Sequence, residues 1–286
     1  MMTATKLLCQ LCPGLLGLGL LFNVSAHARE AESVLVVSID ALHPAALNEK
    51  TVPTLHALMR QGHFTLKGQS VDPPKTLIAH TAMMTGLSPA QSGKLDNDWK
   101  PGEPGVSKPT IFDDAKLRGY RTAYFYAKPK LGYLISNAVD EHALTPDAGI
   151  DLARSFFHEG GRRMAFLHVS GLEGAGTDSG WLSPEYYEEL ADIDMTLAPL
   201  LAEVRKRGNY AVVVTSDHAG HGRQHGTSHP EDYKLPLIAA SNLDRIPKLP
   251  VGTWHVTGLR QLVRKMLATV RTSSARSAMA IKKNAE

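Results

Sequence analysis

Four side chains that commonly bind divalent metal ions lie close together near residue 220. They are one carboxylate and three imidazoles, Asp217, His218, His221 and His225. The preceding run, Tyr210–Val214, is apolar and β-branched, which is typical of a buried strand. Oxygen and nitrogen ligands without thiolates favour Zn²⁺ or Mn²⁺. The cluster therefore predicts a metal site at a strand end, and a polar, glycine-rich loop with surface histidines is the alternative.

The first 28 residues have the pattern of a secretory signal peptide. Lys6 is their only charged residue, Leu15–Val24 is largely apolar, and the tripeptide Ala26-His27-Ala28 offers a cleavage site. This apolar stretch is shorter than the ~20 residues of a membrane-spanning helix. We therefore expect a periplasmic or secreted protein with no membrane anchor after cleavage. Both cysteines, Cys9 and Cys12, fall in this segment, so the mature chain has no thiolate ligand.

The rest of the chain has the length of one α/β domain, predicted over residues 29–270. Residues 271–286 are short of large apolar side chains and rich in Ser, Ala and Lys, which predicts a flexible tail. The whole chain carries 31 Lys and Arg against 28 Asp and Glu. A balance so close to neutral gives no indication of a nucleic-acid-binding surface.

Two polar residues lie where elements of this domain should begin or end. Ser33–Ile39 reads as a buried parallel strand, and Asp40 follows it at the carboxyl edge, where open α/β sheets bind ligands. Asp40 alone would be read as a helix or turn cap. The run Leu77–Met84 predicts a helix that ends at Gly86, which places Thr76 at its N-terminus. Free N–H groups there favour an anion such as phosphate, although a cap is the simpler role for Thr76 alone.

The remaining pattern alternates helices and strands, as expected for a parallel sheet. A first helix over Thr54–Gln61 is predicted to start at Thr54 as its N-cap, and a long helix to start at Ser183. Residues 127–149 read as an irregular segment that identifies no ligand. The other predicted elements are a helix over Thr110–Arg118 and strands over Tyr120–Tyr126, Arg163–Val169 and Tyr233–Ala240.

Several short motifs occur together in an order that resembles a known family. They are Val-Val-Ser-Ile-Asp40, Pro-Lys-Thr76 through His80, Thr85-Gly86-Leu-Ser-Pro, Asn97, Ser-Asp217-His218-Ala-Gly-His and His225-Gly226-Thr. Spread from Ser33 to about Ala240, they resemble the type I phosphodiesterases and nucleotide pyrophosphatases of the alkaline-phosphatase superfamily. In that family a Thr or Ser attacks phosphorus between two metal ions and forms a phospho-enzyme.

The resemblance implies a role for each matching residue. Asp40, Asp217 and His218 would hold one metal ion, with Thr76 as both nucleophile and bridging ligand. A threonine hydroxyl is a poor nucleophile until a metal ion or a base activates it, which agrees with this assignment. Asn97 would donate a hydrogen bond to a phosphoryl oxygen, although a plain turn residue is the alternative. His80 matches as a support for the ligands rather than as a ligand.

The second metal site departs from the family pattern. The resemblance places Glu173 and His225 in that site, with Glu173 where the family has Asp. Thr177 stands where the family has a ligating His, so a neutral oxygen replaces an imidazole. Asp178 or His221 are candidates to supply the missing ligand. One or two divalent ions, with zinc the predicted metal, are therefore expected.

Taken together, the sequence predicts an alkaline-phosphatase-like three-layer sandwich, with a mostly parallel central sheet and helices on both faces. The predicted function is exported, metal-dependent hydrolysis of a small phosphorylated substrate, such as a phosphodiester or a nucleotide. A sulfatase fits less well, because Thr76 stands where that activity needs Cys or Ser. The alternative from another class is a non-catalytic or single-metal protein of the same fold that binds phosphate or another anion.

Overall fold

The computed structural model describes residues 31–243 and 247–267. The predicted signal peptide over residues 1–28 and the predicted tail over residues 271–286 lie outside these described ranges. No helix within the described ranges is both long and apolar enough to cross a membrane.

One eight-stranded sheet organises the described residues, in the order β4-β3-β5-β1-β6-β7-β2-β8. All neighbouring pairs are parallel except those that β7 makes with β6 and β2, so the predicted mostly parallel sheet is confirmed. The strands are β1 Ser33–Ile39, β2 His63–Gln69, β3 Arg121–Tyr126, β4 Glu141–Leu144, β5 Arg163–Val169, β6 Tyr210–Thr215, β7 Lys234–Ser241 and β8 Trp254–His255.

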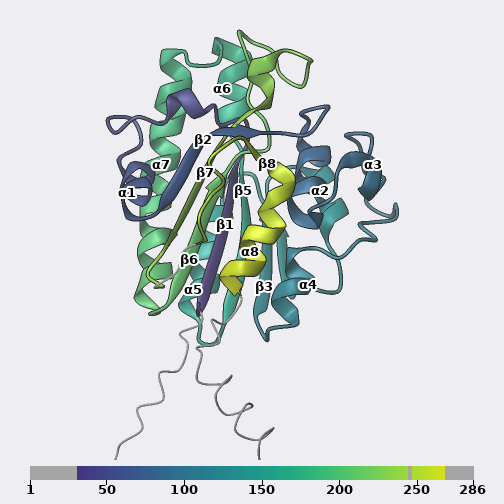
Figure 1. Cartoon of the computed structure of the whole chain (residues 1–286), viewed down its shortest axis with the longest axis vertical. Coiled ribbons are helices and arrows are strands. Elements are labelled where there is room, and N and C mark those ends of the chain that lie inside the picture. The colour runs from purple at the N-terminus through teal and green to yellow at the C-terminus, as the bar shows by residue number, and fades with distance from the viewer. Residues whose placement is uncertain (1–30, 244–246, 268–286) are drawn as a thin grey trace, which may run out of the picture. The chain divides into compact units, whose positions relative to one another are not determined.

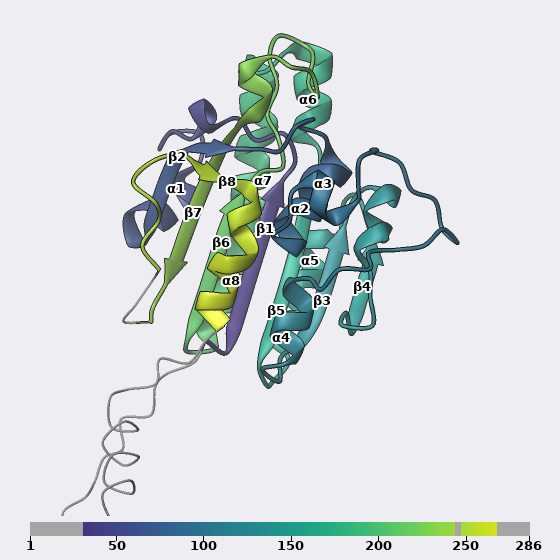
Figure 2. The same ribbon diagram turned by 45° about the vertical axis from the view of Figure 1, so that its right-hand side comes forward.

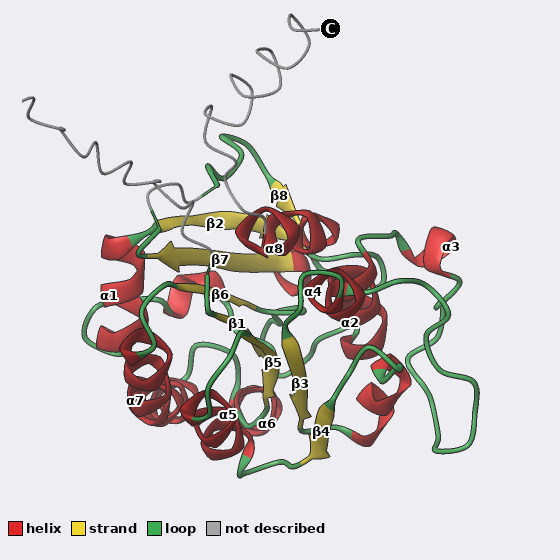
Figure 3. Ribbon diagram, turned by 90° about the horizontal axis from the view of Figure 1, so that it is seen from below, coloured by secondary structure: helices red, strands yellow, loops and turns green. Residues whose placement is uncertain are grey.

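Helices cover both faces of this sheet and complete the predicted three layers (Figures 1 and 3). On one face α1, α5 and α7 bury their apolar side chains against alternate residues of β1, β5 and β6. On the other face α2, α4 and α8 do the same. The bounds of the helices are α1 Pro53–Gln61, α2 Thr76–Thr85, α3 Pro89–Ser92, α4 Ile111–Lys116, α5 Gly149–His158, α6 Leu172–Ser179, α7 Pro184–Lys206 and α8 Leu259–Leu267.

The start of α1 differs from the sequence prediction. Thr54 is not its N-cap, because the helix begins at Pro53 after Val52, whose side chain makes no capping hydrogen bond. The backbone N–H groups of Thr54 and Leu55 instead donate to the two carboxylate oxygens of Asp194, at 2.9 and 2.8 Å. Asp194 is buried in the middle of α7. A side chain from another helix thus satisfies the free donors at the start of α1.

The segment that the sequence left irregular and the polar stretch after β5 both contain regular structure. Residues 127–149 hold the 3₁₀ turn η2, Pro129–Leu134, and the edge strand β4. The polar stretch after β5 folds as α6, which lies beyond the upper end of the sheet in Figure 1. The 45° rotation in Figure 2 shows α6 at the same end of the sheet as the start of α2.

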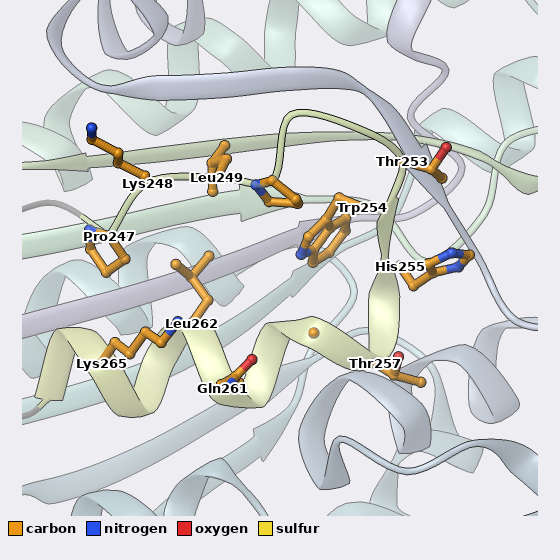
Figure 4. A pocket seen from close by; sticks show the side chains of 12 residues that line it. Pro247, Lys248, Leu249, Thr253, Trp254, His255, Thr257, Gln261, Leu262 and Lys265 are labelled. Carbon is orange, nitrogen blue, oxygen red and sulfur yellow. The ribbon is translucent and has the colours of Figure 1, made fainter.

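A pocket lies beside the outer strand β8, between β8, α8 and the segment Pro247–Pro250 (Figure 4). Its apolar lining includes Leu249, Trp254 and Leu262. None of the residues that the sequence marks as chemically active lines it. The candidate chemistry therefore has to be sought at the strand ends.

Candidate active site

The predicted site residues converge at the carboxyl ends of the central strands. β1 lies between β5 and β6, and the three strands run parallel. Asp40 directly follows β1, whereas Asp217 and His218 follow β6 by two and three residues. Parallel strands end at one edge, so residues 40 and 217 come together although most of the domain separates them in sequence.

Asp40, Asp217 and His218 form a compact, fully buried group. One ligand atom from each lies within 4.8 Å of the others. The Nε2 atom of His218 is 3.4 Å from Oδ1 of Asp40 and 3.4 Å from Oδ2 of Asp217. Those two carboxylate oxygens have no hydrogen-bond partner although they are buried. Buried acceptors without partners are costly, and a divalent ion would satisfy both, so the residues fit the metal that the sequence predicts.

Thr76 is the first residue of α2 and lies beside this group. Its Oγ1 atom is 3.5 Å from Nε2 of His218, and its side chain is almost completely buried. Lys75, not Thr76, is the N-cap of the helix. The hydroxyl is therefore not used as a cap and faces the cluster.

Asn97 also lies at the start of α2. Its Oδ1 atom accepts a hydrogen bond of 2.8 Å from the backbone N–H of Leu77. Since the acceptor end of the amide is held in this way, the donor end, Nδ2, is fixed in orientation and makes no hydrogen bond within the described residues. Such a donor is suited to an anion bound near the helix N-terminus.

Glu173 and His225 form a second group that shares His218 with the first. Oε1 of Glu173 and Nε2 of His225 are 2.8 Å apart, and the rings of His225 and His218 stack with centroids 4.7 Å apart. Thr177 lies one turn after Glu173 on α6, and its hydroxyl donates to the carbonyl of Gly174 at 3.0 Å. Thr177 therefore offers no imidazole and has its hydroxyl proton engaged locally.

Neither candidate substitute joins this second group within the described residues. Asp178 is exposed on α6. His221 instead bonds Asp232 through Nδ1 at 2.7 Å, and its ring stacks on that of His229 with centroids 3.7 Å apart. These three residues form a separate His–Asp cluster in which every oxygen of Asp232 already has a hydrogen-bond donor.

Two residues of the site were missed in the sequence. His168, near the end of β5, accepts a hydrogen bond at Nδ1 from the backbone N–H of Ala127, 3.3 Å away. Nε2 therefore carries the proton and donates to Oδ2 of Asp40 at 3.0 Å. This contact fixes the orientation of the Asp40 carboxylate, a role often found next to metal ligands. A histidine one position before the end of a buried strand was the available signal.

Lys128 is the second missed residue. It follows β3 and reaches into the site, where its Nζ atom is 2.5 Å from Oδ2 of Asp40 and also contacts Oε2 of Glu173. The same ammonium donates to Oγ1 of Thr76 at 3.3 Å. The sequence of residues 127–149 does not indicate this role, because a single lysine after a strand belongs to no motif for a functional site.

His80 lies one turn after Thr76 on α2 and contacts its backbone. Its Nδ1 atom donates to the carbonyl oxygen of Thr76 at 2.8 Å and lies 3.6 Å from Oδ2 of Asp217. Its Nε2 atom is buried without a partner. Burial lowers the pKa of His80 to about 4, because the charged form loses its hydration and the nearby carboxylates offset only part of that loss.

Short distances between the charged groups of the site change the pKa values of several of its residues. Burial alone would raise the pKa of Asp40, but Lys128, His168 and His218 together hold it well below its usual value. Burial likewise opposes ionisation of Glu173, yet its contacts with His225 and Lys128 lower its pKa to about 2. The carboxylates Asp217 and Asp40 raise the pKa of His218 against the effect of its burial. The carboxylates of Asp40 and Glu173 are therefore ionised at neutral pH, which is the form that binds a cation.

The sheet order, the layers and the cluster at the strand ends define an α/β protein of the alkaline-phosphatase type. A family model for type I phosphodiesterase / nucleotide pyrophosphatase matches residues 34–233, which is well over half of the chain. The chain belongs to this family and is an enzyme that acts on phosphoester bonds.

Individual relatives agree on the fold. Murine ectonucleotide pyrophosphatase / phosphodiesterase 5 superposes with a TM-score of 0.64 at 14% identity, over 84% of this chain and 96% of that one. The zinc complex of the C-terminal periplasmic domain of EcEptC from Escherichia coli has a TM-score of 0.61 at 13% identity, over 85% and 84% of the two chains. GPI ethanolamine phosphate transferase 1 from Yarrowia lipolytica is 37% identical over 79 residues, which are 26% of this chain and 8% of that protein.

Proposed function

We propose that this chain is an exported, metal-dependent phosphoester hydrolase that uses Thr76 as its nucleophile. The observation that carries the proposal is the position of the Thr76 hydroxyl, held at a helix N-terminus beside a buried cluster of oxygen and nitrogen donors. A hydroxyl is activated as a nucleophile by nearby positive charge, and a helix N-terminus stabilises the negative charge of a phosphoryl group.

The reaction proceeds in two displacements. The hydroxyl of Thr76 loses its proton to solvent, and Oγ1 forms a bond to phosphorus while the bond from phosphorus to the leaving oxygen breaks. The leaving oxygen takes a proton from water. A water molecule then attacks the phosphorus of the phosphothreonine and gives up a proton as its oxygen bonds to phosphorus. The Oγ1–phosphorus bond breaks, Oγ1 takes a proton from solvent to restore the hydroxyl, and the phosphorylated product leaves. Asn97 donates a hydrogen bond from Nδ2 to a phosphoryl oxygen, because its other end is held by Leu77.

Asp40, Asp217 and His218 would hold the divalent ion. Zinc is the proposed metal, because a buried set of two carboxylates and one imidazole suits it, and a structural relative was solved with zinc. When bound, the ion supplies a Lewis acid at the nucleophile and the phosphoryl group. Glu173 and His225 would be the ligands of any second ion.

A small phosphorylated compound such as a nucleotide phosphodiester is the proposed substrate. An inactive threonine-to-alanine variant of the murine relative was solved in complex with AMP, which supports this substrate class. Export rests on the signal-like pattern of residues 1–28 and agrees with the periplasmic location of the EcEptC domain. The near-neutral charge of the chain agrees with a small substrate rather than a nucleic acid.

Replacement of Thr76 tests the proposal directly. Thr76→Ala removes the attacking oxygen and should lower turnover by several powers of ten, whereas Thr76→Ser keeps a hydroxyl and should retain measurable activity. Initial rates on bis(p-nitrophenyl) phosphate and p-nitrophenyl phosphate would separate diesterase from monoesterase activity. The metal content of each variant should be measured in parallel. Turnover of Thr76→Ala near the wild-type value, with metal bound, would rule out the nucleophile.

A further inference from the structure

Lys128 lies where the two metal-binding groups of the site meet. Its ammonium contacts Asp40 from the first group, Glu173 from the second and the hydroxyl of Thr76 between them. These three partners come from the residue after β1, from α6 and from α2, so three separate parts of the chain place their polar atoms around one cation. The side chain of Lys128 is 21% exposed, which shows that it is largely enclosed by these contacts.

The two groups differ in the oxygens that they leave open. Asp40 Oδ1 and Asp217 Oδ2 have no partner and are available to a metal ion. Both oxygens of Glu173 are engaged, Oε2 by Lys128 and Oε1 by His225. Thr177 stands where the family has a ligating His of the second metal site, and it offers no imidazole. The residues around Glu173 therefore fit an ammonium group and do not fit a second divalent ion.

We propose that the ammonium of Lys128 takes the place of the second metal ion, so that the site binds one divalent ion and carries its second positive charge on the chain itself. The catalytic part of this inference rests on the proposed function. Two features of the chain would then have one explanation. Thr177 stands where the family has a ligating His, and Lys128 supplies a positive charge in contact with Glu173 and Asp40.

The geometry gives Lys128 a direct part in the reaction. Its ammonium is 3.3 Å from Oγ1 of Thr76, which is hydrogen-bonding distance from the attacking atom. A fixed positive charge at this place stabilises the alkoxide of Thr76 and the negative charge that develops on the phosphoryl group. No proton needs to leave Lys128, because the ammonium acts through its charge and its N–H bonds.

Metal counting tests the structural half of the proposal without any substrate. The purified wild-type chain, stripped with chelator and titrated with Zn²⁺, should bind one ion per chain tightly. The double variant Lys128→Met/Thr177→His removes the ammonium and restores an imidazole, so it should bind two. Two tight ions in the wild type, or one in the double variant, would overturn the proposal. If the double variant does not fold, Lys128→Met alone must bind a second ion at least tenfold more tightly than the wild type, and equal affinity overturns the proposal.

Kinetics test the catalytic half. With one equivalent of Zn²⁺ per chain, so that no second ion replaces the lost charge, Lys128→Met should lower kcat by about 10²–10³-fold, the usual effect of losing one charge-stabilising donor, with a smaller effect on KM. Lys128→Arg keeps the charge and should recover part of the rate while still binding one ion. Lys116→Met is the matched control, because Lys116 also pairs with a carboxylate, Asp140 at 2.7 Å, but contacts none of the site residues. A kcat of Lys128→Met within threefold of the wild type would overturn this half.

The two proposals fail in different ways. If the wild type hydrolyses no phosphoester at all, the proposed function fails. The number of ions bound per chain still decides whether Lys128 takes the place of the second metal ion. If the wild type is active but holds two ions, the proposed function stands and the role of Lys128 is wrong.

Discussion

The buried imidazole of His80 should make the stability of this protein depend on pH. Its pKa falls from 6.5 to about 4 in the folded chain. Below pH 6.5 the unfolded chain binds a proton at His80 that the folded chain does not bind until about pH 4. Stability therefore falls as the pH falls through this window, by about 1.4 kcal/mol per pH unit and about 3 kcal/mol in total.

His80→Gln isolates this effect, because glutamine keeps a hydrogen-bond donor near Thr76 but cannot ionise. Both proteins should be unfolded with urea at pH 7.5 and pH 5 in the presence of a chelator, so that metal binding does not contribute. The wild type should lose about 2 kcal/mol more than His80→Gln between these two pH values. Equal losses in the two proteins would refute the reasoning, because they would mean that His80 ionises normally in the folded chain.

Three further outcomes follow from the same contacts. Chelation should abolish phosphoester hydrolysis, and Zn²⁺ or Mn²⁺ should restore it better than Mg²⁺; full activity of protein shown to be free of metal would contradict the metal site. Asp194→Ala should cost about 2–4 kcal/mol of unfolding free energy by urea denaturation, because one buried and one partly buried N–H group of α1 lose their acceptor. Asp192→Ala, at an exposed position of the same helix, is its control, and equal losses would exclude the capping role. Thr177→His should raise the affinity for a second ion in titration calorimetry, but by less than Lys128→Met/Thr177→His does, because Lys128 still contacts Glu173; no increase over the wild type would contradict the assignment of this position.

The interior strands β1, β5 and β6 were predictable because they are buried on both faces, whereas β2 and β4 are partly exposed and were not predicted. The runs Ser33–Ile39 and Arg163–Val169 are fully buried and match β1 and β5 at both ends. The start of α1 was not predictable, because Thr54 has the local chemistry of an N-cap whereas the acceptor comes from Asp194, 140 residues further along the chain. Local patterns report hydrogen bonds between near neighbours, and this one spans two helices.

The same distinction separates the predicted and the missed residues of the site. Asp217 and His218 stand in a short motif, so their sequence neighbours already indicate metal binding. Lys128 has no such neighbours. Its role becomes visible only in the folded chain, where β3 pairs with β5 and Lys128 contacts Asp40. A lysine at a strand end is usually a solvated surface charge, so only the folded arrangement distinguishes this one.

The order of the strands also governs how the molecule meets other chains. The two outer strands of the sheet are β4, with four residues, and β8, with two. A row of unpaired N–H and C=O groups invites another extended chain to add to a sheet, and the four residues of β4 keep that row short on one side. The long strands β1, β5 and β6 are all interior. On the β8 side, β8 pairs only with Gly68 and Gln69, so the first five residues of β2 remain an open edge within the described residues, where an extended chain would add to the sheet.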